Sequence, residues 1–273
     1  MERLRLAKEQ KQFFATFGYL ALPGLVADVI DEITAAFEQV WRDRGHVHEG
    51  EQRSMIVPFI DQHERLCRLL DDPRIEGLVG SLLGDDFNYL GSDGNFYVGD
   101  TQWHSDRWTT ELRWVKVAFY LDAVGRDTGC LRVIPGSHRL QESYAQKVQE
   151  EIGASAEMWG VEGAGVPALA LESEPGDVVV FNHNLKHAAF GGGTRRRMFT
   201  INCCERGVGA QIEAVKEAIS IHAKYDIEQM YSQTMVQTAG PERMVHLEQV
   251  LAHQGDMPEE RAKWRAEQAA RQN

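Results

Sequence analysis

A series of short apolar segments between about Phe87 and Cys203 restricts the fold more than any other feature of the sequence. Valine, isoleucine and aromatic residues dominate these segments, and turn residues separate them, as in the Pro-Gly pairs at 135–136 and 175–176. We expect strands at 95–97, 113–121, 130–134, 168–171, 177–182 and 197–203. Short strands connected by turns predict an antiparallel barrel or sandwich.

Helical periodicity dominates on both sides of these strands. Apolar residues recur at steps of three and four from Val26 to Val40, which predicts an amphipathic helix packed on the core. Asp72 followed by Pro73 is a helix start signal, because it combines a capping side chain with proline at the first helical position. Further helices are expected at 4–14, 64–70, 212–230, 241–253 and 258–268, with a short strand at 19–22. We therefore predict an α+β protein in which residues 1–205 form the functional domain and residues 206–273 are a helical extension of the same domain.

Composition narrows the classes of function. The net charge of −12 over 273 residues argues against a nucleic-acid partner, because phosphate binding needs a basic surface. No apolar run approaches the ~20 residues that cross a bilayer, so no membrane partner is expected. The four cysteines have no C-x-x-C spacing, and no apolar signal segment follows the charged start. These features predict reduced cysteines and a cytoplasmic protein.

His104 and Asp106 are the first candidate site residues. On a strand, side chains two residues apart point to the same face, so this imidazole and this carboxylate would project together. They would supply two ligands of a 2-His-1-carboxylate site, which leaves open positions on Fe(II). A hydrogen-bonded surface pair is the alternative, and the short His-x-Asp motif does not decide between the two.

Longer motifs follow in an order that resembles a known family. The chain reads GCLRVIPGSHR at 129–139 and PGD at 175–177, followed by His187 and three arginines at 195–197. Together with WHSD at 103–106 and FATFGY at 14–19, these segments resemble the phytanoyl-CoA dioxygenase family of Fe(II)- and 2-oxoglutarate-dependent oxygenases, which includes ectoine hydroxylase. The resemblance covers roughly residues 10–205 and leaves the C-terminal helices outside it.

The resemblance implies a double-stranded β-helix, which is a cupin-like jelly-roll barrel with the metal at one mouth. It implies that His104, Asp106 and a distal histidine hold Fe(II), with 2-oxoglutarate and O₂ as cosubstrates. The distal ligand in the family stands just before small residues, which favours His187 in His187-Ala188-Ala189 over His183. His183 is then expected to have a structural role.

A 2-oxoglutarate site also needs a cation for the far carboxylate, and the planar fork of arginine pairs with a carboxylate through two hydrogen bonds. Along the strand, Arg196 shares a polar face with Met198, Thr200 and Asn202, whereas Arg197 shares an apolar face. We expect Arg196 to bind the cosubstrate, and the family's arginine lies at the same place. The choice among Arg195, Arg196 and Arg197 stays open, and a solvated basic cluster is the alternative.

Several other expectations are less specific. Gln102 lies two residues before His104, and Asn95 lies on the preceding strand, so each is a candidate for binding 2-oxoglutarate or the substrate, or for a hydrogen bond within the barrel. Trp108 is a candidate for shaping the substrate pocket, and the segment 140–166 is a candidate lid or an ordinary surface excursion. Apolar residues in the C-terminal helices are expected to pack on the barrel, to cover its mouth or to form a homodimer.

The resemblance implies a function for the whole site. The expected enzyme decarboxylates 2-oxoglutarate to succinate and CO₂ and hydroxylates an unactivated C–H bond of a small molecule. Asp106 disfavours halogenation, because halogenases of this type lack the carboxylate ligand. Desaturation or rearrangement of the substrate, a cupin-like metal-dependent isomerase or hydrolase, and a non-catalytic ligand-binding barrel are the alternatives. Neither the substrate nor the oligomeric state is evident from the sequence.

Overall fold

The computed structural model describes residues 2–225, 227–255 and 257–272, and its strands form two antiparallel sheets. The larger sheet has the order β1-β8-β5-β10-β3-β2, and the smaller has the order β4-β9-β6-β7. The larger sheet contains β1 (Tyr19–Leu22), β2 (Ser54–Ile56), β3 (Asn88–Tyr97), β5 (Trp114–Tyr120), β8 (Val178–Asn182) and β10 (Arg196–Cys204). The smaller contains β4 (Thr101–His104), β6 (Leu131–Val133), β7 (Leu169–Leu171) and β9 (His187–Ala189). This is the expected jelly-roll barrel.

Alternating side chains on the larger sheet divide the core into two parts. On β5, Ala118 and Tyr120 point inward and pack with Leu131 and Val133 of the smaller sheet. The intervening Phe119 points outward into a larger core that is shared with the helices. One face of the sheet therefore lines the barrel, and the other carries the helical layer.

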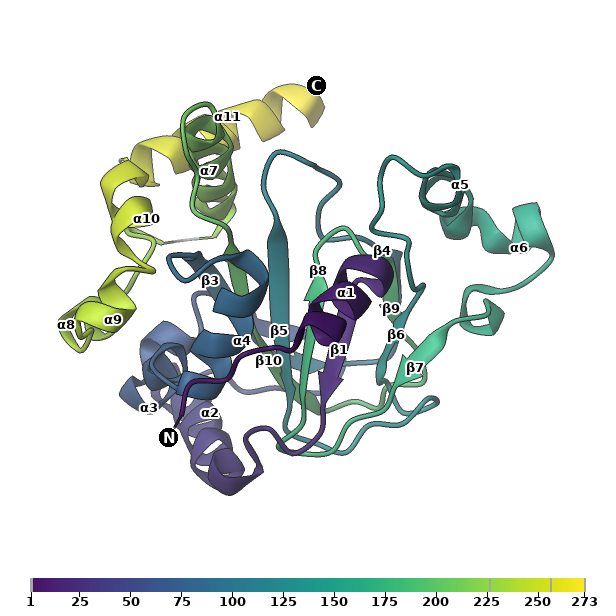
Figure 1. Cartoon of the computed structure of the whole chain (residues 1–273), viewed down its shortest axis with the longest axis horizontal. Helices are drawn as coiled ribbons and strands as arrows, with labels where there is room; N and C mark the ends of the chain where they lie inside the picture. The colour runs from purple at the N-terminus through teal and green to yellow at the C-terminus, as the bar shows by residue number, and fades with distance from the viewer. Residues whose placement is uncertain (1, 226, 256, 273) are drawn as a thin grey trace.

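The helices cover the two outer faces of the barrel, as Figure 1 shows. Those beside the larger sheet include α2 (Ile30–Asp43), α3 (Glu64–Cys67), α4 (Pro73–Leu83), α7 (Gln211–Ser220), α8 (Gln233–Gln237), α9 (Pro241–Met244) and α10 (Glu248–His253). The helices α5 (Ser143–Glu151) and α6 (Ser155–Trp159) lie beside the smaller sheet, while α1 (Lys8–Phe17) precedes β1 and α11 (Met257–Gln272) ends the described chain. The predicted start of α4 is confirmed, because the Asp72 carboxylate accepts a hydrogen bond from the Arg74 backbone N–H at 2.9 Å.

Several predicted elements differ from the structure. The helix expected at 4–14 begins at Lys8 and ends at Phe17, and the helix expected at 241–253 is divided into α9 and α10. The helix expected at 212–230 ends at Ser220 and continues only as a 3₁₀ turn over Ile221–Lys224. The strand expected at 95–97 begins earlier, at Asn88. Glycine and polar residues weaken the strand pattern at the start of β3. Tertiary packing explains the glycine at position 94, because a Cβ on Gly94 would lie 2.1 Å from the Phe59 ring. Strand β2 was not predicted, and it adds to this same edge.

The C-terminal segment packs on the barrel's own helical layer. Val215, Ile219, Leu247 and Val250 are at most 2% exposed and belong to the larger core. Ile221, Val245 and Trp264 remain 36–40% exposed. Dimerisation through these helices stays a prediction that light scattering tests.

A buried ion pair ties this segment to the N-terminal helices. The Arg243 guanidinium is 1% exposed and donates to both carboxylate oxygens of Asp71. Asp71→Asn should lower the free energy of unfolding by about 2 kcal/mol, because it leaves a buried guanidinium without its counter-charge. The loss is smaller than for a fully buried pair, since the Asp71 side chain is 36% exposed. Urea denaturation measures the change. Glu64→Gln, which breaks an exposed pair with Arg68, should change it by less than about 0.5 kcal/mol.

Asp61 makes a second buried link and predicts a dependence of stability on pH. Its carboxylate accepts a hydrogen bond from the Tyr89 hydroxyl at 2.6 Å, and its backbone carbonyl accepts one from Ser232 Oγ at 2.6 Å. Burial raises the pKa of the Asp61 carboxyl from 3.8 to about 6. The folded state therefore binds the proton of the Asp61 carboxyl more tightly than the unfolded state does. The stabilisation that the protonated carboxyl contributes is complete below about pH 4 and is lost as the pH rises through about 6.

The variant Asp61→Asn isolates this effect because it removes the titrating group. Between about pH 4 and about pH 7, the free energy of unfolding of the wild-type protein should fall by about 2 kcal/mol more than that of the variant. Urea denaturation at each pH measures both proteins, and all other titrating groups cancel in the difference. Parallel pH profiles would contradict the assignment.

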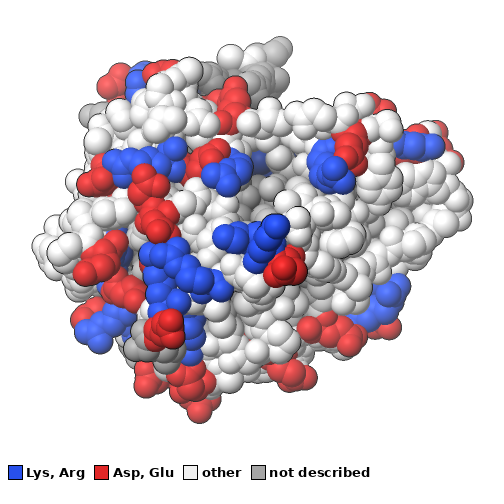
Figure 2. Space-filling view, viewed as in Figure 1, with Lys and Arg blue, Asp and Glu red and all other residues white. Residues whose placement is uncertain are grey.

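The surface shows mixed charge. On the face in Figure 2, Lys and Arg side chains lie beside Asp and Glu side chains. Exposed ion pairs such as Arg5 with Asp85, at 2.8 Å, are part of this surface. All four cysteines are buried and free. Within the described residues, no helix combines the length and the apolar character needed to cross a membrane.

Candidate metal centre and cosubstrate cavity

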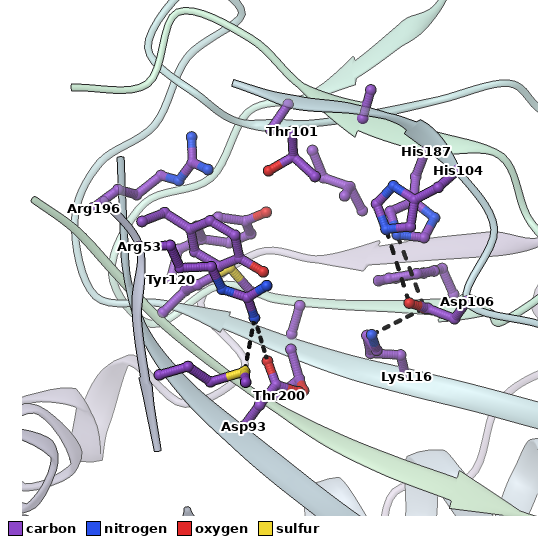
Figure 3. Close-up of a pocket in the computed structure, with 18 of the residues that line it drawn as sticks. Arg53, Asp93, Thr101, His104, Asp106, Lys116, Tyr120, His187, Arg196 and Thr200 are labelled. Carbon is purple, nitrogen blue, oxygen red and sulfur yellow. Dashed lines mark hydrogen bonds and ion pairs between the residues drawn. The ribbon is translucent and has the colours of Figure 1, made fainter. Parts of the chain in front are cut away.

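Three side chains converge at one end of the barrel. His104, Asp106 and His187 place one ligand atom each within 4.8 Å of one another. The Asp106 carboxylate oxygens lie 4.0 Å from His104 Nε2 and 3.9 Å from His187 Nε2. The two imidazoles have ring centroids 4.2 Å apart, and Figure 3 shows both pointing toward the carboxylate. Two nitrogen donors and one carboxylate form the donor set of a 2-His-1-carboxylate site.

Backbone hydrogen bonds orient both imidazoles. His104 Nδ1 donates to the Gln102 carbonyl at 2.8 Å, and His187 Nδ1 donates to the Leu185 carbonyl at 2.8 Å. Both Nε2 lone pairs are therefore left facing the metal position. Burial lowers the pKa of His187 to about 4, so this imidazole is neutral and able to bind a cation at neutral pH.

The Asp106 carboxylate is kept ionised by its surroundings. Burial alone would raise its pKa, but Lys116 and the imidazoles of His187 and His183 lower it well below its usual range. Lys116 Nζ lies 2.9 Å from Asp106 Oδ2. The same lysine is partly buried, and the negative charges of Asp106 and Asp93 raise its pKa against the effect of burial. It therefore stays charged and orients one carboxylate oxygen.

The backbone position of Asp106 differs from the prediction that it shares a strand with His104. Strand β4 ends at His104, and Asp106 lies in the bend that follows. The bend is held by hydrogen bonds from the Asp106 and Arg107 backbone N–H groups to the His183 carbonyl, at 2.9 and 3.1 Å. The His183 ring is buried outside the metal cluster and packs 5.5 Å from the Trp114 ring. Its backbone positions Asp106, while the His187 ring lies in the cluster with His104 and Asp106.

Arg196 occupies the opposite side of a cavity of about 260 Å³ that His104, Asp106 and His187 also line. The residue is only 6% exposed, and its Nε and Nη1 have no hydrogen-bond partner among the described residues. Two glycines make room for it, since a Cβ would lie 1.6 Å from Arg196 Nη1 if placed on Gly129 and 2.5 Å if placed on Gly192. A buried cation without a partner is costly, so this cavity suits an anionic ligand.

The neighbouring arginines have partners elsewhere. Arg197 pairs with Asp122 at 2.5 Å and with Glu38 at 2.8 Å. Arg195 is about half exposed and lies 3.5 Å from Glu38. The predicted strand faces hold, because Arg196, Met198 and Thr200 line the cavity while Phe199 and Ile201 belong to the helical core.

The structure does not bring the less specific candidates into the cavity. A register shift between Thr101 and His104 turns Thr101 toward the cavity, and Gln102 points out toward α6. Asn95 is buried behind the lining, where its amide donates to Asp93 at 2.7 Å. Trp108 is 38% exposed and does not line the cavity.

The segment 140–166 lies behind the ligand strands and is not a cover for the cavity. Its helices α5 and α6 pack against the outer face of the smaller sheet, with Trp103, Ile134 and Phe190 at the contact. Trp103 Nε1 donates to the Gly163 carbonyl at 2.8 Å. This segment therefore supports β4 from the side opposite to His104.

Sequence reasoning missed Lys116 and Tyr120, which line the cavity from β5. A signal for Lys116 was present, because it is the only charged residue in an apolar run from Trp114 to Leu121. A lysine in such a strand is seldom buried without a carboxylate partner. Tyr225, from the C-terminal segment, also lines the cavity and had no such signal.

The fold and the site together define a class of protein, a jelly-roll barrel with a 2-His-1-carboxylate centre. Comparison with protein families matches residues 14–198 to the phytanoyl-CoA dioxygenase (PhyH) family. This protein belongs to that family. It is an oxygenase-type enzyme that depends on non-haem iron and 2-oxoglutarate, with Fe(II), 2-oxoglutarate and O₂ as cofactor and cosubstrates.

Solved structures share the fold at low sequence identity. The non-haem α-ketoglutarate-dependent carbocyclase SnoK from nogalamycin biosynthesis is 22% identical, with a TM-score of 0.58 over 73% of this chain and 84% of that one. EctD from S. alaskensis, solved with 2-oxoglutarate and 5-hydroxyectoine, is 23% identical, with a TM-score of 0.56 over 73% of this chain and 76% of that one. HygX from Streptomyces hygroscopicus, solved with nickel and 2-oxoglutarate, is 17% identical, with a TM-score of 0.60 over 74% of this chain and 88% of that one. A search of the curated proteins found no match.

Proposed function

We propose that this enzyme hydroxylates an unactivated C–H bond of a small molecule, with release of succinate and CO₂ from 2-oxoglutarate. The observation that carries the proposal is the position of the buried, unpartnered Arg196 across one cavity from His104, Asp106 and His187. Family membership and the 2-oxoglutarate bound in the EctD and HygX structures also support it.

The chain's own residues would hold each component. His104, Asp106 and His187 would be the metal ligands, and Lys116 would keep the Asp106 carboxylate ionised and oriented. Arg196 would bind the far carboxylate of 2-oxoglutarate through its free nitrogens. Bound together, Fe(II), 2-oxoglutarate and O₂ supply the oxidising power that an unactivated C–H bond requires. The apolar wall that contains Leu131 and Phe181 would limit the access of water to the reacting atoms.

Product analysis tests the reaction type, because related folds include a carbocyclase and an epimerase. The protein would be loaded anaerobically with Fe(II) and 2-oxoglutarate, exposed to O₂, and assayed for succinate against a collection of small molecules. We expect a product heavier than its substrate by one oxygen atom, with one succinate released per product. A product that has lost two hydrogens, or an isomer of the substrate, would replace hydroxylation by desaturation or rearrangement. The variant Asp106→Ala is the inactive control.

A further inference from the structure

Arg53 lines the same cavity as the metal ligands, and its guanidinium is held in place by the protein. Its Nε and Nη2 donate to Asn95 Oδ1 at 2.8 and 2.6 Å, and Nη2 also lies 3.2 Å from Met55 Sδ. The Tyr97 ring lies beneath it, with 4.3 Å between Arg53 Cζ and the ring centroid. In the described part of the chain Nη1 has no hydrogen-bond partner, so an oriented donor is available to a ligand.

The charges that line the cavity do not balance. Its wall carries three positive side chains, Arg53, Lys116 and Arg196, and two negative ones, Asp93 and Asp106. Asp93 already has partners, because it accepts hydrogen bonds from Thr200 Oγ1 and from Asn95 Nδ2 and lies 3.7 Å from Arg53 Nη2, which leaves Arg53 Nη1 unpaired among the described residues. The charge of Fe(II) and the two carboxylates of 2-oxoglutarate would cancel each other. The loaded cavity therefore keeps an excess of one positive charge, which an anionic substrate would neutralise.

The size of the cavity indicates that a substrate would extend past Arg53. The cavity of about 260 Å³ is small for a ligand site, since such sites hold roughly 300–1,000 Å³, and it must also take 2-oxoglutarate. Met55 lines both this cavity and an outer groove of about 590 Å³. That groove lies between the segments 44–62 and 227–233 and is lined by polar side chains such as Gln62, Gln229 and Gln233. A substrate larger than the remaining space would extend past Met55 toward this groove, beside Arg53.

We propose that Arg53 is a substrate-recognition residue whose free Nη1 binds an oxyanion, a carboxylate or a phosphate, carried by the substrate. The polar remainder of the substrate lies in the groove beyond Met55. The inference rests on the proposed function, because it assigns the space that the metal and 2-oxoglutarate leave open. In Figure 3, Arg53 projects into the cavity between Arg196 and the ligands, as this assignment requires.

Calorimetry on the loaded protein tests the proposal. Protein held anaerobically with Fe(II) and saturating 2-oxoglutarate would be titrated with acetate and, separately, with inorganic phosphate. We expect one of them to bind the wild-type protein at least tenfold more tightly than Arg53→Gln, and the preferred anion identifies the substrate's oxyanion. The matched control is Arg195→Gln, an arginine that pairs with Glu38 at 3.5 Å and should bind the anion like the wild type. Equal affinity in the wild type and Arg53→Gln, or binding of neither anion, would overturn the proposal.

A second titration separates this inference from the proposed function. The Kd of 2-oxoglutarate for the Fe(II) protein should change less than twofold in Arg53→Gln. A rise of tenfold or more would place Arg53 in the cosubstrate site and would overturn its assignment to the substrate. If the wild-type protein bound no 2-oxoglutarate and released no succinate, the proposed function itself would fail, and the anion titration without 2-oxoglutarate would still report on Arg53.

Discussion

Replacing His187 with alanine will abolish Fe(II) binding and turnover, whereas replacing His183 will leave the metal site intact. His187 Nε2 faces the Asp106 carboxylate at 3.9 Å, and its other nitrogen is fixed by the Leu185 carbonyl. His183 is buried outside this cluster, and burial lowers its pKa to about 3, so it remains a neutral ring against Trp114. We expect no stoichiometric iron in His187→Ala, or in His104→Ala and Asp106→Ala, and at least a thousandfold loss of succinate release.

His183→Ala is the matched control for this experiment. It keeps the backbone carbonyl that holds Asp106, so the protein should retain stoichiometric iron while losing about 1–2 kcal/mol of stability to the vacated space. Iron content after anaerobic gel filtration and urea denaturation measure the two effects. The assignment is wrong if His183→Ala loses the iron and His187→Ala retains it.

Arg196→Ala will raise the apparent KM for 2-oxoglutarate by at least an order of magnitude. A desolvated, charge-assisted pair contributes about 1.5–3 kcal/mol, and Arg196 has the buried, free nitrogens that such a pair needs. Arg195→Ala and Arg197→Ala should change this KM much less, because their guanidinium groups pair with Glu38 and, for Arg197, with Asp122. Initial rates of succinate release against 2-oxoglutarate concentration measure all three.

Gly129→Ala tests the same site without removing any charge. Gly129 has φ +91°, and an added methyl group would meet Arg196 Nη1, so the guanidinium must move. We expect this variant to raise the KM for 2-oxoglutarate in the same direction as Arg196→Ala. A larger effect in Arg197→Ala than in Arg196→Ala would mean that the cosubstrate binds on the other face of β10.

Predictions from sequence succeeded where a local pattern determines the structure. The two-residue period along β10 placed Arg196 on the inner face and Phe199 on the outer one. The same rule misplaced Gln102, because an irregular register between Thr101 and His104 breaks the alternation. Strand irregularities depend on the partner strand, so the residues of β4 alone do not predict them.

Contacts between distant parts of the chain were the least predictable. Asp106 is held by the carbonyl of a residue 77 positions later, and a local pattern carries no information about such a bond. The apolar spacing in the C-terminal helices predicted that one face of these helices is buried. It did not show that Tyr225 would complete the cavity wall or that Arg243 would be buried against Asp71.

The link between Asp61 and the segment around Ser232 has a consequence for synthesis of the protein on the ribosome. Ser232 donates to the Asp61 backbone across 171 positions, and the Tyr231 hydroxyl donates to the Tyr89 carbonyl across 142. Every strand of the barrel has been translated by Cys204, yet its helical core stays open until these later residues leave the exit tunnel. A nascent chain arrested between these two points would leave part of this core uncovered, and exposed apolar surface of this kind favours chaperone binding and aggregation.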